Sequence, residues 1–368
     1  MSQDKNWILK ELPLDKDIET KKVLKNLPSA HAALAELKGI ASKIPNQNIL
    51  INTLGLQEAK DSSAIENIIT TNDDLYKSEL NLDSFTSLNA KEVQNYVAAV
   101  RKGFELILEK GFLTNNIILS IQKELEGNNA GFRKLPGTEL KNSATGEVVY
   151  TPPQDYKEIE RLMDNLEKFI NSHDKYELDP LVKMAIIHYQ FESIHPFYDG
   201  NGRTGRIINI LYLIQEKLQD LPILYLSSYI IKNKPDYYRL LQKVRETDSW
   251  EEWLLFMING IEKTSRETID LILKISELMM SYKHEIRENY KFYSQDLLNN
   301  LFKHPYTKIE FLVNDLNVSR ITAANYLNKL ADDGLLIKKK LGTGNYYINE
   351  PLFNLLTNRQ KKCTGGKI

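Results

Sequence analysis

Residues 191–206, FESIHPFYDGNGRTGR, bring together the side chains of this sequence that are best suited to chemistry. They lie between two apolar runs, LVKMAIIHYQF and IINILYLI, which are expected to form buried helices. Gly200, Gly202 and Gly205 allow a tight turn whose backbone N–H groups point inward, and a helix that starts at such a turn makes an anion site. His195, at the end of the first apolar helix, can act as a general base near neutral pH.

The charged side chains next to these glycines fit a polyphosphate. Arg203 and Arg206 are three residues apart, so both guanidinium groups can face one site from the first helical turn. Asp199 offers a hard oxygen ligand beside the turn, which suits Mg²⁺ bound jointly with phosphate. Taken singly, a histidine near a helix end is more often structural, and two arginines near an aspartate are usually ion pairs. Their combination within twelve residues predicts a functional phosphate site.

The segment HPFYDGNGRTGR, residues 195–206, resembles the signature of the Fic family, His-Pro-Phe-x-Asp-Gly-Asn-Gly-Arg-x-x-Arg, at every specified position. FESI before it, GFRK at 131–134 and TPP at 151–153 support the resemblance, which extends over roughly residues 60–260. Members of the family mostly transfer AMP from ATP to a hydroxyl group of a target protein. The resemblance therefore implies a protein adenylyltransferase that uses ATP and Mg²⁺. The motif alone does not identify the donor, so the transferred group can also come from another nucleotide or be phosphocholine.

The resemblance also implies roles for single residues. His195 takes the proton from the attacking Ser, Thr or Tyr hydroxyl, Asp199 holds Mg²⁺ between the α- and β-phosphates, and pyrophosphate leaves. A hairpin at 140–150 is the flap that aligns the target's backbone by strand addition. The phosphate-binding residues are Gly200, Asn201, Gly202, Arg203 and Arg206. The candidates for the nucleoside pocket, which are equally well read as ordinary half-buried helix residues, are Tyr229, Asn233, Tyr237 and Tyr238.

A second segment, SSAIEN at 62–67, resembles the inhibitory motif of the family, in which Ser or Thr is followed after three residues by Glu and then Gly or Asn. Ser62 and Glu66 share one helical face, and Asn67 completes the motif. The resemblance implies that Glu66 pairs with Arg206. A carboxylate on that guanidinium competes with the γ-phosphate, so ATP binds in a non-productive pose. In some members the same Glu assists water in removing AMP, and the sequence leaves this second activity open.

The elements that position these residues are expected to be mostly helical. The amino-terminal region, residues 1–95, should contain a helix at 27–42 that starts near Pro28. It should also contain a short helix at 61–69, which carries the inhibitory motif behind Asp61 as a capping residue.

Residues 96–262 are expected to form the catalytic core. Two amphipathic helices within 96–128 are split near Gly111, and Thr114 is a plausible cap for the second. The hairpin described above follows them, and helices resume over 156–173.

The remaining chain changes character. Residues 263–290 are expected to be a connecting helix, 291–352 a winged helix-turn-helix domain and 353–368 a tail. Ser319 should cap the second helix of that domain and Gly334 should end it. The predicted fold class is therefore mainly α, a Fic-type helical core with a β-hairpin flap plus a C-terminal winged helix-turn-helix domain.

A winged helix suggests DNA binding, with its second helix in a major groove. Residues 303–368 carry eleven Lys or Arg against five Asp or Glu, which is a modest basic excess. The side chains expected to face DNA are Arg320, Thr322, Asn325, Lys329, Lys338, Lys339 and Lys340, with the wing tip at 342–345. Alternatively, this domain contacts proteins or packs on the core. The competing function is therefore a DNA-binding transcriptional regulator with a Fic-like nucleotide-sensing core, or a toxin neutralised in cis.

Composition sets the remaining bounds. The 368 residues carry 48 Lys and Arg against 49 Asp and Glu, so no global field attracts nucleic acid or an anionic membrane. The start of the chain is unlike a signal peptide, and no stretch approaches the about eighteen apolar residues of a membrane helix. The single cysteine, Cys363, excludes an internal disulfide. We expect a cytoplasmic protein without membrane contact that modifies a target protein or itself; its oligomeric state, including a homodimer, is open.

Overall fold

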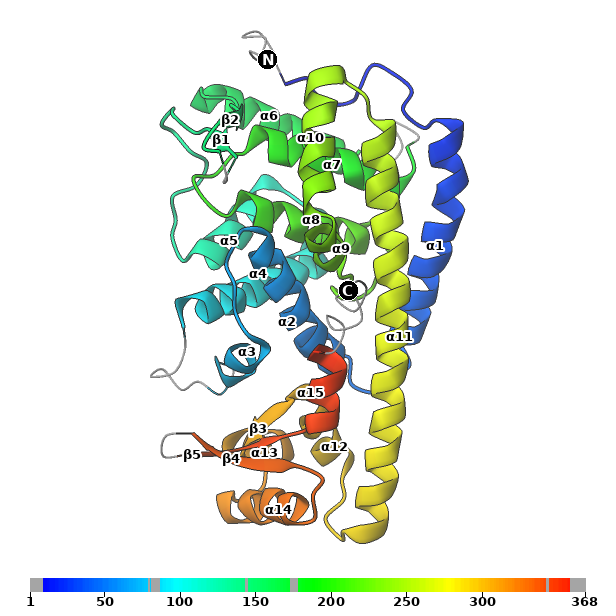
Figure 1. Cartoon of the computed structure of the whole chain (residues 1–368), viewed down its shortest axis with the longest axis vertical. Coiled ribbons are helices and arrows are strands. Elements are labelled where there is room, and N and C mark those ends of the chain that lie inside the picture. Colours follow the sequence, from blue (N-terminus) through cyan, green and yellow to red (C-terminus); the bar gives the residue numbers. More distant parts are fainter. Residues whose placement is uncertain are drawn as a thin grey trace, which may run out of the picture.

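The computed structural model describes residues 9–78, 80, 87–142, 145–172, 178–341 and 344–357. The described chain is mainly helical, as the sequence predicts, with two small antiparallel sheets (Figure 1). The helices up to the end of the core are α1 (Lys21–Ala41), α2 (Asn48–Ile65), α3 (Asn72–Ser78), α4 (Leu88–Lys110), α5 (Asn115–Glu126), α6 (Tyr156–Ile170), α7 (Pro180–Ile194), α8 (Asn201–Gln215), α9 (Leu226–Lys232) and α10 (Lys234–Thr247). The later helices are α11 (Glu251–Asn289), α12 (Gln295–Lys303), α13 (Ile309–Leu316), α14 (Arg320–Asp332) and α15 (Glu350–Thr357). The strands are β1 (Leu140–Lys141), β2 (Val148–Tyr150), β3 (Tyr306–Lys308), β4 (Ile337–Leu341) and β5 (Gly344–Ile348).

Helices α7 and α8 lie at the centre of the region predicted to be the catalytic core, and the polar loop 195–200 joins them (Figure 1). Every residue of α7 from Leu181 to Ile194 is buried, because this helix is apolar around most of its circumference rather than along one stripe. Asp179 caps α7 and Pro180 occupies its first turn, which fixes where the helix starts. Helix α7 packs on α6, α8 and α11, and α8 packs on α4 and α5. The loop is therefore held at both ends by buried helices.

The helices before the hairpin follow the sequence pattern. Gly111 ends α4 in the left-handed region, with a φ of +80°, and the Thr114 hydroxyl accepts a hydrogen bond from the N–H of Ile117 to cap α5. Strands β1 and β2 form the expected hairpin, of which residues 143–144 lie outside the described chain. The helix expected over 156–173 ends earlier, at the end of α6, and residue 173 lies outside the described chain.

Helix α1 differs from the expectation. It begins at Lys21 rather than near residue 27, capped by the Thr20 hydroxyl, and Pro28 lies inside it. Val23 and Leu27 are buried, so the apolar stripe continues before the proline and extends the helix by more than a turn.

The expected short helix at 61–69 is instead the end of α2, which runs without interruption to Ile65. Asp61 therefore does not cap a new helix. Ser62 and Ser63 are fully buried within α2, because the apolar packing that begins at Ile49 continues through them. The inhibitory motif thus lies at the carboxyl end of a long helix rather than at the start of a short one.

Helix α11 is a single helix of 39 residues, about 58 Å long at 1.5 Å per residue. The expected boundary between core and connecting helix, near residue 262, does not interrupt it. Helix α1 packs along it, and α11 reaches from the core down to the carboxy-terminal elements (Figure 1).

The carboxy-terminal elements follow each other as α12, β3, α13, α14, β4 and β5, with a three-stranded antiparallel sheet of order β3-β5-β4. Ser319 caps α14, and Gly334 follows its end with a φ of +86°. The assignment of these elements to the winged-helix class stays a prediction, and residues 342–343 of the expected wing tip lie outside the described chain. The expected boundary between domain and tail, at 352–353, falls inside α15, whose Leu352 and Leu356 are buried, and 358–368, with Cys363, lie outside the described chain.

Candidate active site

The loop that carries His195 is fixed from behind by Arg133. The Arg133 guanidinium is fully buried; its Nε donates to the carbonyl of His195 at 2.8 Å, and it also donates to the carbonyl of Pro153 where the hairpin ends. The N–H of Arg133 donates to the carbonyl of Pro196 at 2.8 Å. His195 itself has a φ of +49°, a left-handed conformation that ends α7. The GFRK segment noted in the sequence therefore positions the histidine.

His195 is electrostatically suited to accept a proton. Burial lowers its pKa to about 4, and the guanidinium groups of Arg133 and Arg245 act in the same direction. The imidazole is therefore neutral at pH 7. It lines a cavity of about 650 Å³, together with Glu66 and Arg206.

The turn between the two helices is held by Asn201. Its side-chain oxygen accepts from the N–H of Phe197, and its side-chain nitrogen donates to the Phe197 carbonyl, both at 2.8 Å. Phe197 is fully buried, and Gly200 has a φ of +76°. Both polar atoms of the Asn201 side chain are hydrogen-bonded to Phe197, so they are not free to bind phosphate. The groups at this turn that can bind phosphate are the backbone N–H groups at the start of α8.

Asp199 lies at the mouth of this turn. Its side chain is 80% exposed, and one of its oxygens accepts from the N–H of Gly200 at 2.7 Å. The described chain contains no group of three or more His, Cys, Asp or Glu placed to hold a metal ion. One exposed carboxylate beside an anion site nevertheless fits Mg²⁺, which keeps several waters and takes phosphate oxygens as further ligands.

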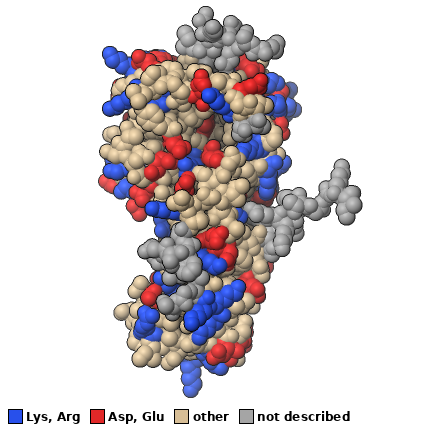
Figure 2. Space-filling model, turned by 60° about the vertical axis from the view of Figure 1, so that its left-hand side comes forward, with Lys and Arg blue, Asp and Glu red and all other residues tan. Residues whose placement is uncertain are grey.

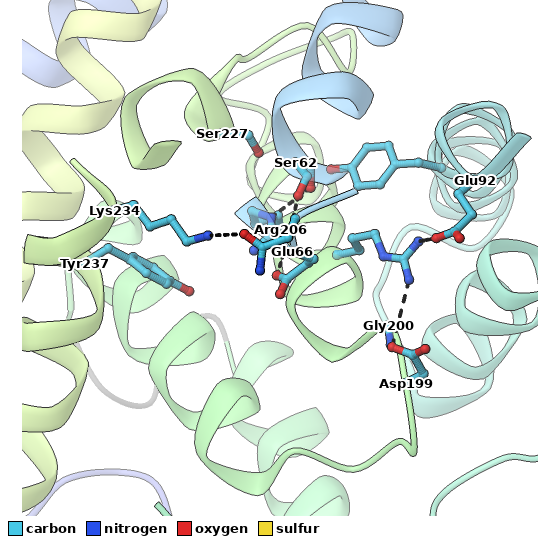
Figure 3. A network of polar contacts seen from close by, with 12 residues as sticks. Ser62, Glu66, Glu92, Asp199, Gly200, Arg206, Ser227, Lys234 and Tyr237 are labelled. Atoms are coloured by element: carbon cyan, nitrogen blue, oxygen red, sulfur yellow. Dashed lines mark hydrogen bonds and ion pairs between the residues drawn. The ribbon is translucent and has the colours of Figure 1, made fainter. Parts of the chain in front are cut away.

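The two arginines of α8 point to different partners. Arg203 is buried and pairs with Glu92 at 2.9 Å and Glu126 at 3.0 Å, and its guanidinium lies 3.9 Å from Asp199. Arg206 turns to the opposite side, toward the cavity (Figure 3). The expectation that both guanidinium groups face one site is not met in this structure, because each follows its nearest carboxylates.

Arg206 is held by residues 62–67, the segment predicted to be inhibitory and called the inhibitory segment below. Its Nε donates to the Ser62 hydroxyl at 2.8 Å, and its Nη2 donates to the Ser62 carbonyl at 2.9 Å and to the Glu66 carboxylate at 2.8 Å (Figure 3). Burial by itself lowers the pKa of Arg206, and Glu66 together with Tyr237, Glu192 and Tyr96 more than offsets this, so the pKa is raised overall. A Cβ at Gly202 would come within 2.2 Å of the Glu66 carboxylate. The missing side chain of Gly202, in the first turn of α8, is thus what allows the Glu66 carboxylate to approach Arg206.

A polar cluster that the sequence did not predict anchors α2. The Glu58 carboxylate is buried, accepts from the N–H of Ser227 at 3.2 Å and from its hydroxyl, and lies 3.3 Å from the Tyr96 hydroxyl. Burial raises the pKa of Glu58 to about 7. Glu58 lies two turns before Glu66, so it fixes the helix that carries the inhibitory segment. The available signal was an acidic residue in the apolar run NILINTLGLQE.

The four nucleoside-pocket candidates separate into two pairs. Tyr237 and Tyr238 line the cavity, and the Tyr237 hydroxyl lies 2.8 Å from Nε2 of the buried His188. Tyr229 packs instead against Phe256, and the Asn233 side chain donates to the Tyr229 carbonyl at 2.8 Å. Tyr229 and Asn233 are not among the described residues that line the cavity.

The cavity also has polar walls that sequence reasoning missed. The Lys234 ammonium donates to the Asn67 side chain at 3.2 Å, and the Arg245 guanidinium lies 4.0 Å from the ring centroid of Tyr150 on the hairpin. The missed lining residues are Glu192, Lys234, Arg239, Gln242 and Arg245, most of them from α10. Their signal was the polar face that α10 presents around its two tyrosines.

The side chains expected to face DNA are partly engaged within the carboxy-terminal domain. Arg320 pairs with Glu310 at 3.3 Å and Lys329 with Asp333 at 2.9 Å. Figure 2 shows basic side chains gathered on this lower part of the molecule, where the exposed stretch 338–340 lies. None of the described helices combines the length and the apolar character that a membrane span requires.

Three family models match the chain. The model of the "Fic/DOC family N-terminal" region matches residues 24–105, that of the "Fic/DOC family" matches 112–213, and that of the "Protein adenylyltransferase SoFic-like, C-terminal domain" matches 278–352. The second of these spans the loop of His195 and both arginines of α8. The chain therefore belongs to the Fic family.

Named relatives are similar over less than half of the chain. "Protein adenylyltransferase Fic" of Aedes aegypti is 27% identical over 168 residues, which are 46% of this chain and 31% of that protein. The protein of the same name from Drosophila mojavensis is 26% identical over 158 residues, 43% of this chain and 29% of that protein. The match thus spans about a third of the length of these relatives.

Solved structures share the fold. A Fic family protein from Desulfovibrio desulfuricans G20 superposes with a TM-score of 0.59 at 21% identity, covering 92% of this chain and 98% of that one. A Fic domain containing signaling protein from Bacteroides thetaiotaomicron gives a TM-score of 0.53 at 18% identity, covering 68% of this chain and 96% of that one. The first likeness extends over the carboxy-terminal elements as well as the core.

Proposed function

We propose that the protein is an autoinhibited protein adenylyltransferase, which transfers AMP from ATP to a Ser, Thr or Tyr hydroxyl of a target protein. The observation that carries the proposal is one cavity in which a neutral His195 and a carboxylate-bound Arg206 lie together. A base and a phosphate-binding cation serve the transfer, while Glu66 on that cation restrains it. The names of the relatives described above point to the same activity.

In the proposed reaction the target hydroxyl attacks the α-phosphorus of ATP. A bond forms from the hydroxyl oxygen to phosphorus, the bond to the oxygen that bridges the α- and β-phosphates breaks, and pyrophosphate leaves. His195 accepts the hydroxyl proton, for which its low pKa keeps it unprotonated at pH 7. The start of α8 and Arg206 offer N–H groups to the phosphates. Mg²⁺, which Asp199 would hold, neutralises phosphate charge when bound.

The restraint is a competition for one guanidinium. The Arg206 guanidinium already donates to the hydroxyl and the carbonyl of Ser62. The N–H that faces the cavity can therefore donate either to the Glu66 carboxylate, as it does here, or to a γ-phosphate oxygen of ATP. Glu66 is 34% exposed and lies at the end of α2, where it can turn away without unfolding the helix. Its release would free Arg206 for a productive ATP pose.

The hairpin is the proposed docking edge for the target. Residues 139–142 and 149–150 line the cavity that holds His195, and Val148 and Val149 are 41% and 37% exposed. An extended segment of the target can add to such an edge and bring its hydroxyl toward His195. Glu66 lines the same cavity, so it is also placed to orient a water that removes AMP from a modified target.

The direct test compares wild type, Glu66→Gly and His195→Ala with labelled ATP, Mg²⁺ and lysate proteins. We expect strong labelling of target proteins, or of the chain itself, by Glu66→Gly, and none by His195→Ala or by the double variant. Mass spectrometry of the labelled species identifies both the added group and the modified residue. Silence of Glu66→Gly with ATP, other nucleoside triphosphates and a phosphocholine donor would show that the chain is not a restrained transferase.

A further inference from the structure

The carboxy-terminal domain, residues 291–357, packs on α2, which carries most of the inhibitory segment, and on α3, the helix that follows the segment. Helices α12 and α15 contact α2, whose carboxyl end carries Glu66. Strand β3 reaches α3, the next helix after the segment, through a hydrogen bond from Tyr306 to Asp73. Figure 1 shows α2 passing from the core, beside α8 and α9, down to α15. One helix therefore joins the active site to this domain.

The contact is a compact aromatic and polar seam. The Tyr306 hydroxyl donates to Asp73 at 2.7 Å, and the Tyr306 ring lies 5.7 Å from that of Tyr76 on α3. The Tyr76 ring lies 5.8 Å from that of Phe353 on α15, and its hydroxyl accepts from Gln57 on α2 at 3.0 Å. Tyr76 and Tyr306 are both buried. These five residues, here called the domain seam, link α2, α3 and the carboxy-terminal domain.

The seam is mechanically close to the inhibitory segment. Gln57 lies on α2 five residues before Ser62, and Lys60 donates to Asn72 at 2.8 Å, which ties α2 to α3 on the far side of the segment. A helix moves largely as a rigid rod, and α2 is about 27 Å long for its 18 residues. A displacement of α2 at the seam, which has to loosen the bonds of Glu58 to Ser227 and Tyr96 as well, therefore carries Ser62 and Glu66 with it.

We propose that the carboxy-terminal domain is part of the inhibitory device: the domain seam holds α2 and α3 so that Glu66 stays on Arg206, and loosening the seam activates transfer. The proposal rests on the proposed function of Glu66 and adds what controls it. Helix α2 has two arrangements, with Glu66 on or off Arg206, and any ligand of the domain that favours the loosened seam shifts this equilibrium toward the active one.

The test disrupts the domain seam and measures the effect on the inhibitory segment in two independent ways, by hydrogen exchange and by AMP transfer. In the full chain, Tyr306→Ala removes the ring and the hydroxyl from the seam without touching the active site. We expect faster hydrogen exchange of the amides of residues 62–68, and at least a fivefold rise in transfer from labelled ATP. In a Glu66→Gly background the same substitution should add nothing to transfer. Tyr306→Phe, which removes only the hydroxyl bonded to Asp73, should have the same effect in smaller measure. Tyr347→Phe is its matched control, because the 2.9 Å bond of Tyr347 to Asn328 lies within the same domain, away from the seam.

Two results would overturn the proposal: unchanged exchange at 62–68 in Tyr306→Ala, or an equal further rise in the Glu66→Gly background, which would mean that the seam acts by another route. If Tyr306→Ala does not fold, Phe353→Ala opens the same seam from α15 and takes its place. If Glu66→Gly itself is silent, the proposed function fails, whereas the exchange measurement still decides whether the seam holds the segment.

Discussion

The motif 195–206, which is the loop 195–200 and the start of α8, meets the predicted inhibitory segment 62–67 at Arg206, but the two are held in different ways. The loop is fixed by buried hydrogen bonds, from Arg133 behind it and from Asn201 within it. The segment ends a helix, and its Glu66 makes one hydrogen bond to Arg206 from a side chain that is 34% exposed. A hydrogen bond to a charged group contributes about 1.5–3 kcal/mol. The site proposed for the chemistry is therefore preformed, whereas the proposed restraint is reversible.

Removing a side chain that fixes the loop of His195 should have the largest effect on stability and transfer. Arg133→Ala leaves the carbonyls of His195 and Pro153 buried without their donor, so we expect about 3 kcal/mol less unfolding free energy. In a Glu66→Gly background, transfer should fall by about a hundredfold or more, because a displaced base loses its alignment. Denaturant unfolding and transfer rates measure both. Lys134→Ala, an exposed neighbour, is the control, and equal effects of the two variants would contradict a positioning role for Arg133.

The burial of His195 predicts a dependence of stability on pH. Its folded-state pKa, about 4, lies below the ordinary value of 6.5, so the unfolded chain binds more protons between these values and stability is lost as pH falls. From pH 7 to pH 5 this histidine should account for about 2 kcal/mol of lost unfolding free energy. His195→Ala should lose that much less over the same range. Parallel curves for the two proteins would mean that the imidazole titrates normally in the folded chain.

The contact between residues 62–67 and Arg206 should respond to small changes, which are seen in the transfer rate. If α2 moves away from Arg206 as a whole, the bond from Nε of Arg206 to the Ser62 hydroxyl exists in the restrained state only. Ser62→Ala then costs that state about 1 kcal/mol, and transfer should rise about fivefold. Ser63→Ala is a matched control, because Ser63 is equally buried and its hydroxyl has no hydrogen-bond partner among the described residues. Initial rates with labelled ATP distinguish the two. A rise of the same size in Ser63→Ala would show that packing of α2, and not the bond to Arg206, sets the restraint.

Much of the fold could be predicted from local sequence. The caps Thr114 and Ser319 and the end of α4 at Gly111 are set by hydrogen bonds and backbone angles of neighbouring residues. The starts of the short helix expected at 61–69 and of α1 were misplaced, because burial of serines in α2, and an apolar stripe before Pro28, outweighed local capping signals.

The candidate site was predictable as a set of residues but not as an arrangement. The motif placed His195 and Asp199 in the loop and both arginines in the first turn of the next helix, yet the direction of Arg203 depends on Glu92 and Glu126 from two other helices. The same holds for the polar residues of α10 and for Glu58, whose partners come from distant parts of the chain. Only the tertiary packing decides which charges face the cavity.

The most direct test of the account is the single-turnover rate of AMP transfer from labelled ATP, measured for wild type, Glu66→Gly and Glu66→Gln at saturating ATP. If the Glu66 charge on Arg206 is the restraint, Glu66→Gly should exceed wild type by up to about a hundredfold, in line with the upper value of about 3 kcal/mol for a hydrogen bond to a charged group, and Glu66→Gln should fall between them. Equal rates for the three proteins would contradict the claim that Glu66 withholds Arg206 from ATP.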